Sequence, residues 1–191
     1  MAISNSERIG RGLEVLRTGL APFIEQEMKA VHGSSWHDFA KQSCFKDNDW
    51  KVVDGKVQWE VYLILMVIWD QWNTVFSKTL GPVERSYVSE LRDVRKRWAH
   101  QQPFSYDDTY RALDTMSRLL KAVSAAEAEE ITRMAQETMR VRIEEQVRTQ
   151  TRRKSSVPVE GTPMGGLKPW REIVMPHPDV ASGRYQQAEF A

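Results

Sequence analysis

The sequence predicts an all-α fold, a bundle of four to five helices followed by a flexible C-terminal tail. Apolar residues recur at spacings of three and four along several long segments, which is typical of amphipathic helices. Glycines are few, 10 in 191 residues, which favours long helices over many short strands. Start signals precede the apolar segments, and five of the eight prolines fall in residues 155–191.

The first predicted helix begins at a capping box and ends near His32. In a capping box, the Ser4 hydroxyl and the Glu7 carboxylate accept hydrogen bonds from free backbone N–H groups. Pro22 lies inside this helix and is expected to kink it. The apolar face behind the cap has helical spacing and consists of Ile9, Leu13, Leu16, Leu20, Phe23, Ile24 and Met28.

Two further helices are predicted on either side of Pro82. One spans about residues 57–80 and is apolar on nearly all sides along residues 61–69, so we expect it to be the central helix of the bundle. The next begins at Pro82, because Pro at the first helical position and Glu84 in the first turn are start signals. It must end before Pro103.

Two more capped helices complete the predicted fold. The fourth begins at Ser105–Asp108, and Ser124–Glu127 is interpreted as a capping box that begins a fifth. This last helix is acidic at its start and basic at its end, and its thin apolar stripe predicts only partial packing. We therefore divide the chain into a bundle over 1–125, a charged extension helix over 126–154 and a Pro/Gly-rich linker over 155–191.

Composition argues against several classes of protein. Lys plus Arg number 27 and Asp plus Glu 26, so the net charge of +1 does not by itself indicate a nucleic-acid or membrane partner. One cysteine and four histidines argue against a disulfide framework and a structural metal site, so we expect neither metal nor cofactor. The longest apolar run, residues 61–69, is too short for a ~30 Å hydrocarbon core, and no secretory signal begins the sequence. We expect a soluble, cytoplasmic protein that does not contact a membrane.

The segment with the most chemical potential is LRDVRKRWAHQ, residues 91–101. Its cationic residues are Arg92, Arg95, Lys96 and Arg97, followed by His100 at a helix C-terminus, where the helix dipole favours a protonated imidazole. One interpretation is a solvated cationic face beside a capping histidine. The other is a phosphodiester site, in which His100 acts as general acid or base and an arginine stabilises the charge that develops on the phosphate.

A histidine and an arginine suffice for metal-free attack by a ribose 2′-hydroxyl, a reaction open to RNA and closed to DNA. Arg95 and His100 are five positions apart in the sequence, which is about 140° around a helix. They can share one phosphate only if the helix unwinds near its end. Arg97 and His100, three positions apart, are expected to share a face of the helix.

Residues 95–100, RKRWAH, fit the R-x4-H motif of HEPN (higher eukaryotes and prokaryotes nucleotide-binding) domains. The segment ERSYVSELRDVRKRWAHQQPFSYDDTYRALDTMSRLL around it resembles the bacterial HEPN domains of the Swt-one type. The resemblance covers about residues 8–125 and the charged helix that follows. It implies an all-α bundle of four or five helices and, often, a homodimer whose two motifs meet across the interface. Active members are metal-independent endoribonucleases, and many others are catalytically silent interaction modules.

The sequence departs from the family pattern at one position of the motif. HEPN domains usually carry Asn or Asp directly after the motif arginine, and here that residue is Lys96. A carboxamide or carboxylate accepts hydrogen bonds and can orient the arginine or the histidine, whereas an ammonium group only donates. Lys96 can still contact a phosphate, so the departure favours RNA or nucleotide binding more than it favours catalysis.

The C-terminal segment also carries a resemblance. GLKPWREIVMPHPDVASGRYQQAEFA, residues 166–191, is similar to the opening of large bacterial ATPases that carry this HEPN type at their N-termini. Those ATPases occur beside methyltransferases in phage-defence and restriction-like gene clusters. The sequence contains no G-x-x-x-x-G-K-[ST] motif and so no P-loop of its own. A fragment, a truncated gene product and a stand-alone N-terminal module all remain open.

Two functions of different classes follow. The first is a ribonuclease or RNA-binding effector in which Arg95 and His100 are catalytic and Arg92, Lys96 and Arg97 contact the RNA backbone, acting as a homodimer. The second is a non-catalytic helical adaptor that dimerises or docks to a partner ATPase. Four aromatic residues of the predicted central helix are expected in the core rather than as a platform for stacked bases, namely Trp59, Tyr62, Trp69 and Trp72.

Overall fold

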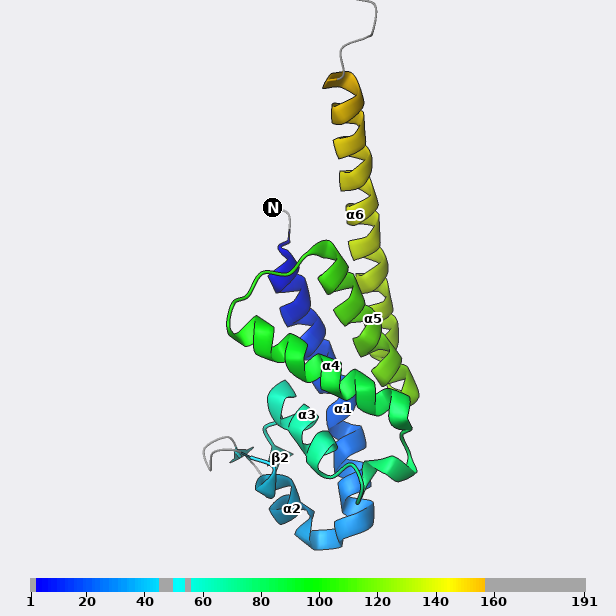
Figure 1. Ribbon diagram of the computed structural model, residues 1–191. Helices are drawn as coiled ribbons and strands as arrows, with labels where there is room; N and C mark the ends of the chain where they lie inside the picture. The colour runs from blue at the N-terminus through cyan, green and yellow to red at the C-terminus, as the bar shows by residue number, and fades with distance from the viewer. Residues whose placement is uncertain (1–2, 45–49, 54–55, 157–191) are drawn as a thin grey trace, which may run out of the picture. The chain divides into compact units, whose positions relative to one another are not determined.

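A computed structural model describes residues 3–44, 50–53 and 56–156 (Figure 1). The predicted all-α bundle is confirmed. Its elements are α1 (Asn5–His32), α2 (Trp36–Gln42), a hairpin of β1 (Val52–Val53) and β2 (Lys56–Val57), α3 (Val61–Asp70), α4 (Pro82–Ala99), α5 (Tyr106–Ala122) and α6 (Ala128–Ser156). The first compact unit of the chain spans Met1–Val147. The linker was predicted over 155–191: residues 155 and 156 belong to α6, and residues 157–191 lie outside the described residues.

Helix α1 is the element against which most of the others pack. It contacts α2, α3, α4 and α5. The Ser4 hydroxyl caps it by accepting the N–H of Glu7 at 3.1 Å, as predicted, while the Glu7 carboxylate accepts from Arg11 at 2.9 Å. The helix runs through Pro22 and ends at His32, and Gly33 follows with a φ of +56°, in the left-handed region that suits glycine. Its fully buried residues match the predicted face and are Ile9, Leu16, Leu20, Ile24 and Met28.

The predicted helix over 57–80 is wrong in its length, because α3 covers only Val61–Asp70. On its N-terminal side, Val57 pairs with Val52 in the hairpin. On its C-terminal side, Asn73 and Thr74 are weak helix formers, and backbone hydrogen bonds shift to irregular spacings such as that from the Ser77 N–H to the Trp72 carbonyl at 2.8 Å. Trp59 and Trp72 therefore flank the helix, and both remain in the core as expected.

The predicted starts of α4 and α5 are confirmed. The Gly81 N–H donates to the Glu84 carboxylate at 2.8 Å, and α4 begins at Pro82. At α5, Ser105 and Asp108 form a reciprocal capping box.

The capping box predicted at Ser124 is wrong. Ser124 has a φ of +56° and belongs to the end of α5, where its N–H bonds to the Lys121 carbonyl and the N–H of Ala125 bonds to the Leu120 carbonyl, both at 3.0 Å. This is a Schellman motif, in which a left-handed residue turns the chain and satisfies the last free carbonyls of the helix. The next helix begins four residues later, at Ala128.

The first half of α6 lies antiparallel to α5 (Figure 1). The hydroxyls of Ser117 and Thr132 bond at 2.8 Å, and Asp107 pairs with Arg142 at 2.7 Å. Ala128, Ile131 and Ala135 are buried in the core, so the beginning of this charged helix packs with the bundle. No helix in the part of the chain that the structure describes is both long enough and apolar enough to cross a membrane.

Helices α1 and α5 approach closely at Gly12, which generates a test of the packing. A Cβ at this position would lie 2.7 Å from Leu113 Cδ2 and 3.0 Å from Met116 Sδ, and both side chains are fully buried. Overpacking costs about 1–3 kcal/mol, and the higher helix propensity of alanine returns at most about 1 kcal/mol. Gly12→Ala should therefore lower the free energy of unfolding by about 1 kcal/mol, as measured by urea denaturation.

Gly10→Ala is the matched control for this substitution. Its Cβ would meet the ring of Trp98 at 3.1 Å, and that side chain is 38% exposed and has room to shift. Gly10→Ala should cost less stability than Gly12→Ala. Equal losses would show that helix packing at Gly12 is looser than the structure indicates.

Candidate functional site

A groove of about 440 Å³ runs between α3 and α4. Its α3 wall is formed by Tyr62, Leu65 and Met66, and its α4 wall by Ser89, Arg92, Asp93, Arg95, Lys96 and His100. The structure thus brings together four of the five site residues expected from sequence, namely Arg92, Arg95, Lys96 and His100. Ser89 and Asp93 were not expected. Ser89 precedes Arg92 by three positions and Asp93 precedes Lys96 by three, and this spacing is the signal that places them on the same helix face.

Helix spacing explains how His100 reaches the groove. His100 follows Lys96 by four positions and Asp93 by seven, so it lies on the same face of α4, and its N–H still bonds to the Lys96 carbonyl at 3.1 Å. Arg95, about 140° away around the helix, reaches the same groove with its long side chain, which lies over the Tyr62 ring. The helix then ends: Gln101 has a φ of +54°, its N–H bonds to the Trp98 carbonyl and that of Gln102 to the Arg97 carbonyl, both at 3.0 Å, which is again a Schellman motif.

Arg95 is held on the wall of the groove by an aromatic ring and a carboxylate. Its guanidinium lies 4.9 Å from the centroid of the Tyr62 ring, and one of its nitrogens lies 4.0 Å from Glu60 Oε2. The Glu60 side chain is 71% exposed, so this long ion pair is screened by water and contributes little to stability. The Arg95 side chain is 29% exposed and so remains accessible to an anion.

Trp69 of α3 supports two further arginines of α4. The guanidinium of Arg92 lies 4.7 Å from the Trp69 ring centroid, and one of its nitrogens lies 3.2 Å from the sulfur of Met66. The guanidinium of Arg85, one turn after the start of α4, lies 5.0 Å from the same ring and 5.7 Å from that of Trp72. Sequence reasoning missed this stack because it depends on how α3 packs against α4.

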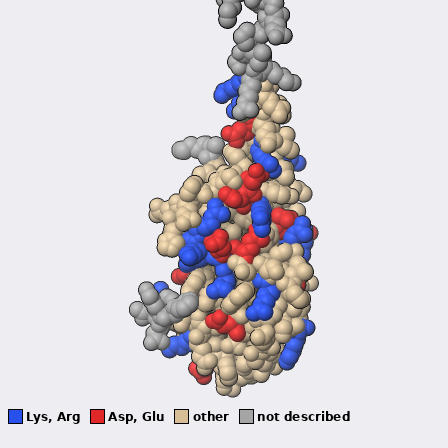
Figure 2. Space-filling view, viewed as in Figure 1, with Lys and Arg blue, Asp and Glu red and all other residues tan. Residues whose placement is uncertain are grey.

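Apart from Arg95, the cations in and beside the groove lack carboxylate partners of the kind found elsewhere among the described residues. Figure 2 shows Lys and Arg interspersed with Asp and Glu over the face in view, in keeping with a net charge of +1. Among the described residues, however, no carboxylate lies within ion-pair distance of Arg85, Arg92, Lys96 or His100. Lys96 and His100 are exposed. The groove therefore offers positive charge that a bound anion can neutralise.

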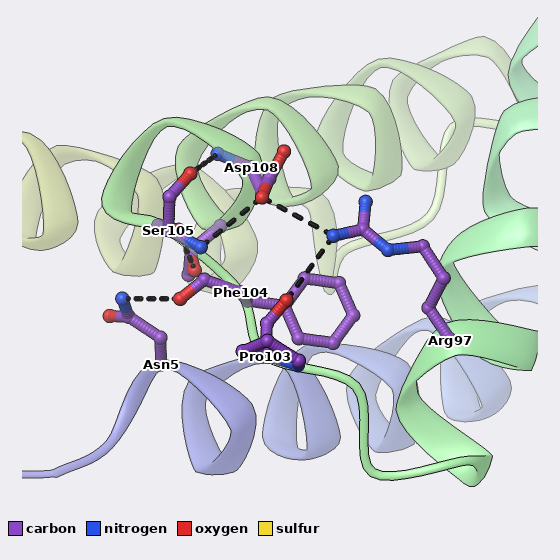
Figure 3. A network of polar contacts seen from close by, with 7 residues as sticks. Asn5, Arg97, Pro103, Phe104, Ser105 and Asp108 are labelled. Atoms are coloured by element: carbon purple, nitrogen blue, oxygen red, sulfur yellow. Dashed lines mark hydrogen bonds and ion pairs between the residues drawn. The ribbon is translucent and has the colours of Figure 1, made fainter.

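Arg97 does not line the groove, and the expectation that it shares a face with His100 is wrong. Its guanidinium donates to the Pro103 carbonyl and to Asp108 Oδ2, both at 3.3 Å, and lies 4.7 Å from the Phe104 ring centroid (Figure 3). Asn5 of α1 also donates to the Phe104 carbonyl at 3.0 Å. Arg97 is therefore a structural residue that fixes the segment directly after His100.

Hydrogen bonds hold the pKa of the Asp108 carboxyl below its usual value. The largest cause is the hydrogen bond from the Ser105 backbone N–H, which burial partly opposes. Hydrogen bonds from the Ser105 side chain and from Arg97, together with the positive charge of Arg97, lower the pKa further. The ionised carboxylate thus stabilises the α4–α5 connection.

No group of three or more His, Cys, Asp or Glu side chains gathers at a metal-binding distance in the described part of the chain. The groove residues that could hold a ligand are the cations of α4, which suit a phosphate or another anion.

The depressed pKa of Asp108 predicts a pH-dependent contribution to folding. A carboxyl with a lower pKa in the folded state contributes stability above its unfolded pKa and loses it as the pH falls through the folded pKa. The difference in free energy of unfolding between the wild type and Asp108→Asn should be constant above about pH 5 and shrink below about pH 4. Denaturant titrations at several pH values measure it. A stability difference for Asp108→Asn that does not change with pH would contradict the assignment.

Comparison with known proteins identifies the family. The sequence model described as Swt1-like HEPN matches residues 11–124. This span includes α3, α4, α5 and the whole groove. No curated protein and no solved structure matches the chain. This match covers more than half of the sequence, and it agrees with the helical bundle. The chain therefore belongs to the Swt1-like HEPN family.

Proposed function

We propose that this HEPN domain is a metal-independent endoribonuclease that uses Arg95 and His100. The observation that carries the proposal is that the two residues of the R-x4-H motif line one groove, beside cations without carboxylate partners among the described residues. The contact of the Arg95 guanidinium with the Tyr62 ring at 4.9 Å supports it, because this contact holds Arg95 on the wall of the groove that His100 also lines.

The reaction is attack of a ribose 2′-oxygen on the adjacent phosphorus, with cleavage of the bond from phosphorus to the 5′-oxygen. His100 removes the 2′-hydroxyl proton or gives a proton to the departing 5′-oxygen. Arg95 stabilises the extra negative charge on the pentacovalent phosphorane, where a preorganised cation acts most strongly. The products are one strand with a 2′,3′-cyclic phosphate and one with a 5′-hydroxyl.

Arg92 and Lys96 contact the RNA backbone in this proposal. Both line the groove, one or two turns from His100, and supply positive charge to neighbouring phosphates. Arg97 is not among the residues proposed to bind RNA, because its guanidinium already donates hydrogen bonds to Asp108 and to the Pro103 carbonyl.

A homodimer completes the proposed site. One His100 cannot act as base and acid on the same phosphate at the same time, so two copies that face each other would divide the two roles. His100 is exposed at the end of α4, which supports its access to a second copy.

A non-catalytic adaptor is the second candidate, and Lys96 is the observation that favours it. Its ammonium cannot accept a hydrogen bond from Arg95 or His100, as the usual Asn or Asp of the motif can. In this alternative the bundle dimerises or docks to a partner ATPase. For either function we propose a bacterial phage-defence or restriction-like setting, which rests on the likeness of residues 166–191 to the start of such ATPases.

Incubation with structured RNA in EDTA tests catalysis. The wild type should cleave, and His100→Ala and Arg95→Ala should each reduce the rate by about 10² to 10⁴, since each removes a group that acts in the transition state. Mass spectrometry of the products should find 2′,3′-cyclic phosphate ends. Arg111→Ala is the matched control, because Arg111 is paired with Glu90 outside the groove and its loss should leave the rate unchanged.

Lys96→Asn separates the two candidate functions. If the wild type is silent and Lys96→Asn cleaves RNA, the site is a degenerate nuclease. If neither protein cleaves, as a dimer or with a partner ATPase added, the adaptor is correct and the nuclease proposal fails.

Sedimentation at micromolar concentrations tests the dimer. The chain of 22.1 kDa should sediment as a species of twice that mass. A single monomeric species across the range would exclude the composite site, and catalysis would then have to use one copy of His100.

A further inference from the structure

We infer that the site continues along α4 toward its N-terminus, where Arg85 and Arg92, stacked on Trp69, hold the backbone of unpaired RNA. The inference rests on the proposed function only in taking RNA as the ligand. It does not depend on whether the RNA is cleaved. It adds a second phosphate-binding position to the site and a preference for single strands.

Arg85, Arg92 and Lys96 form a row on one side of α4. They are seven and four positions apart, which corresponds to rises of about 10 Å and 6 Å along the helix. Residues at these spacings lie close to one face. Arg92 and Lys96 line the groove, and Arg85 is joined to Arg92 through the ring of Trp69, over which both guanidiniums lie at 4.7–5.0 Å from the centroid. The row therefore extends from the groove along the helix.

Stacking on Trp69 prepares the two arginines for anions. A guanidinium over an aromatic ring keeps its N–H donors free in the plane of the group while the ring restricts its motion. The Arg85 side chain is half-buried against the two rings, and within the described structure its guanidinium has no carboxylate partner. A phosphate oxygen beside its terminal nitrogens would gain charge-assisted hydrogen bonds at little further cost in side-chain entropy.

Several other arginines of the bundle are paired with carboxylates, unlike the two arginines of this row. Arg97 pairs with Asp108, Arg111 with Glu90 and Arg142 with Asp107. Neither Arg85 nor Arg92 has a carboxylate within ion-pair distance in the ranges that the structure covers. A cation that gains its first anionic partner on binding contributes more affinity than one that must first break an ion pair.

The opposite wall of the groove favours an unpaired base. Leu65 and Met66 are largely buried, and the parts of them that line the groove form an apolar wall together with Tyr62. The volume of about 440 Å³ lies in the range of pockets that hold small organic groups. A base can enter only when it is splayed out from its neighbours, as in single-stranded loops, whereas duplex RNA presents phosphates and 2′-hydroxyls across a wide, shallow groove.

Asp93 fixes which part of the groove takes the phosphate. Its exposed carboxylate lies on the α4 wall, between Arg92 and Lys96 in sequence, and has no cationic partner among the described residues. Its negative charge repels a phosphate placed beside it. The RNA backbone must therefore pass along Arg85 and Arg92 and then along the end of the groove that holds Arg95 and His100. Removing this charge should strengthen binding.

Fluorescence anisotropy with the full chain tests the inference. The probe is a short, unpaired 2′-O-methyl RNA strand, which cannot be cleaved because its 2′-oxygen carries no proton and is blocked. Arg85→Gln and Arg92→Gln should each weaken binding, and each should lower the slope of log K against log salt concentration by about 0.7. Asp93→Asn should tighten binding, and Arg111→Gln, the matched control, should leave it unchanged.

Two further measurements keep the test decisive. Arg85→Lys retains the charge but loses the planar stack, so it should bind between the wild type and Arg85→Gln; circular dichroism confirms that each variant is folded. A blunt-ended duplex of the strand with its 2′-O-methyl complement, which has no unpaired loop, should bind more weakly than the single strand. Equal binding of the two probes, or unchanged salt slopes for folded Arg85→Gln and Arg92→Gln, would overturn the inference.

The outcome can be separated from that of the proposed function. Cleavage is measured in parallel on an unmodified strand. Binding that depends on Arg85 and Arg92 without any cleavage supports the inference and contradicts the nuclease. Cleavage that is insensitive to both arginines, with unchanged affinity, supports the nuclease and contradicts the inference.

Discussion

The candidate site depends on the face that α4 presents to α3. His100 follows Lys96 by four positions and Asp93 by seven, so all three lie on the groove face of the helix, while Arg95 reaches the groove from beside that face over the Tyr62 ring. Gln101, with a φ of +54°, then turns the chain away directly after His100. The Arg97–Asp108 ion pair, the Pro103 carbonyl and the bond from Asn5 to Phe104 then fix the segment that follows (Figure 3).

The two sides of α4 divide structure from binding. One side carries Arg97 and Trp98, whose indole N–H donates to the Ser6 carbonyl at 3.1 Å, and joins α4 to α1 and α5. The other carries cations that rest on rings of α3, with Arg95 on Tyr62 and Arg92 on Trp69. The hydrogen bonds on the first side hold the helix against α1 and α5, and the charges on the second side face the groove.

Local signals in the sequence were sufficient for the helix starts at Ser4, Pro82 and Ser105, because caps act within one turn. They failed at Ser124, where a serine that resembles an N-cap adopts the left-handed conformation at the end of α5. The R-x4-H spacing indicated Arg95 and His100, but not the roles of Arg97 and Arg85. Those roles depend on Asp108 and Trp69, which come from other helices and become neighbours only in the folded chain.

The most direct test of the shared groove is an NMR titration of the His100 imidazole with a non-cleavable 2′-O-methyl RNA strand. The account predicts that the His100 ring resonances shift as the strand binds, because a phosphate then lies beside the ring, and that Arg95→Ala reduces this shift. RNA that binds with equal affinity while the His100 resonances stay unchanged would place the ligand elsewhere and contradict the account.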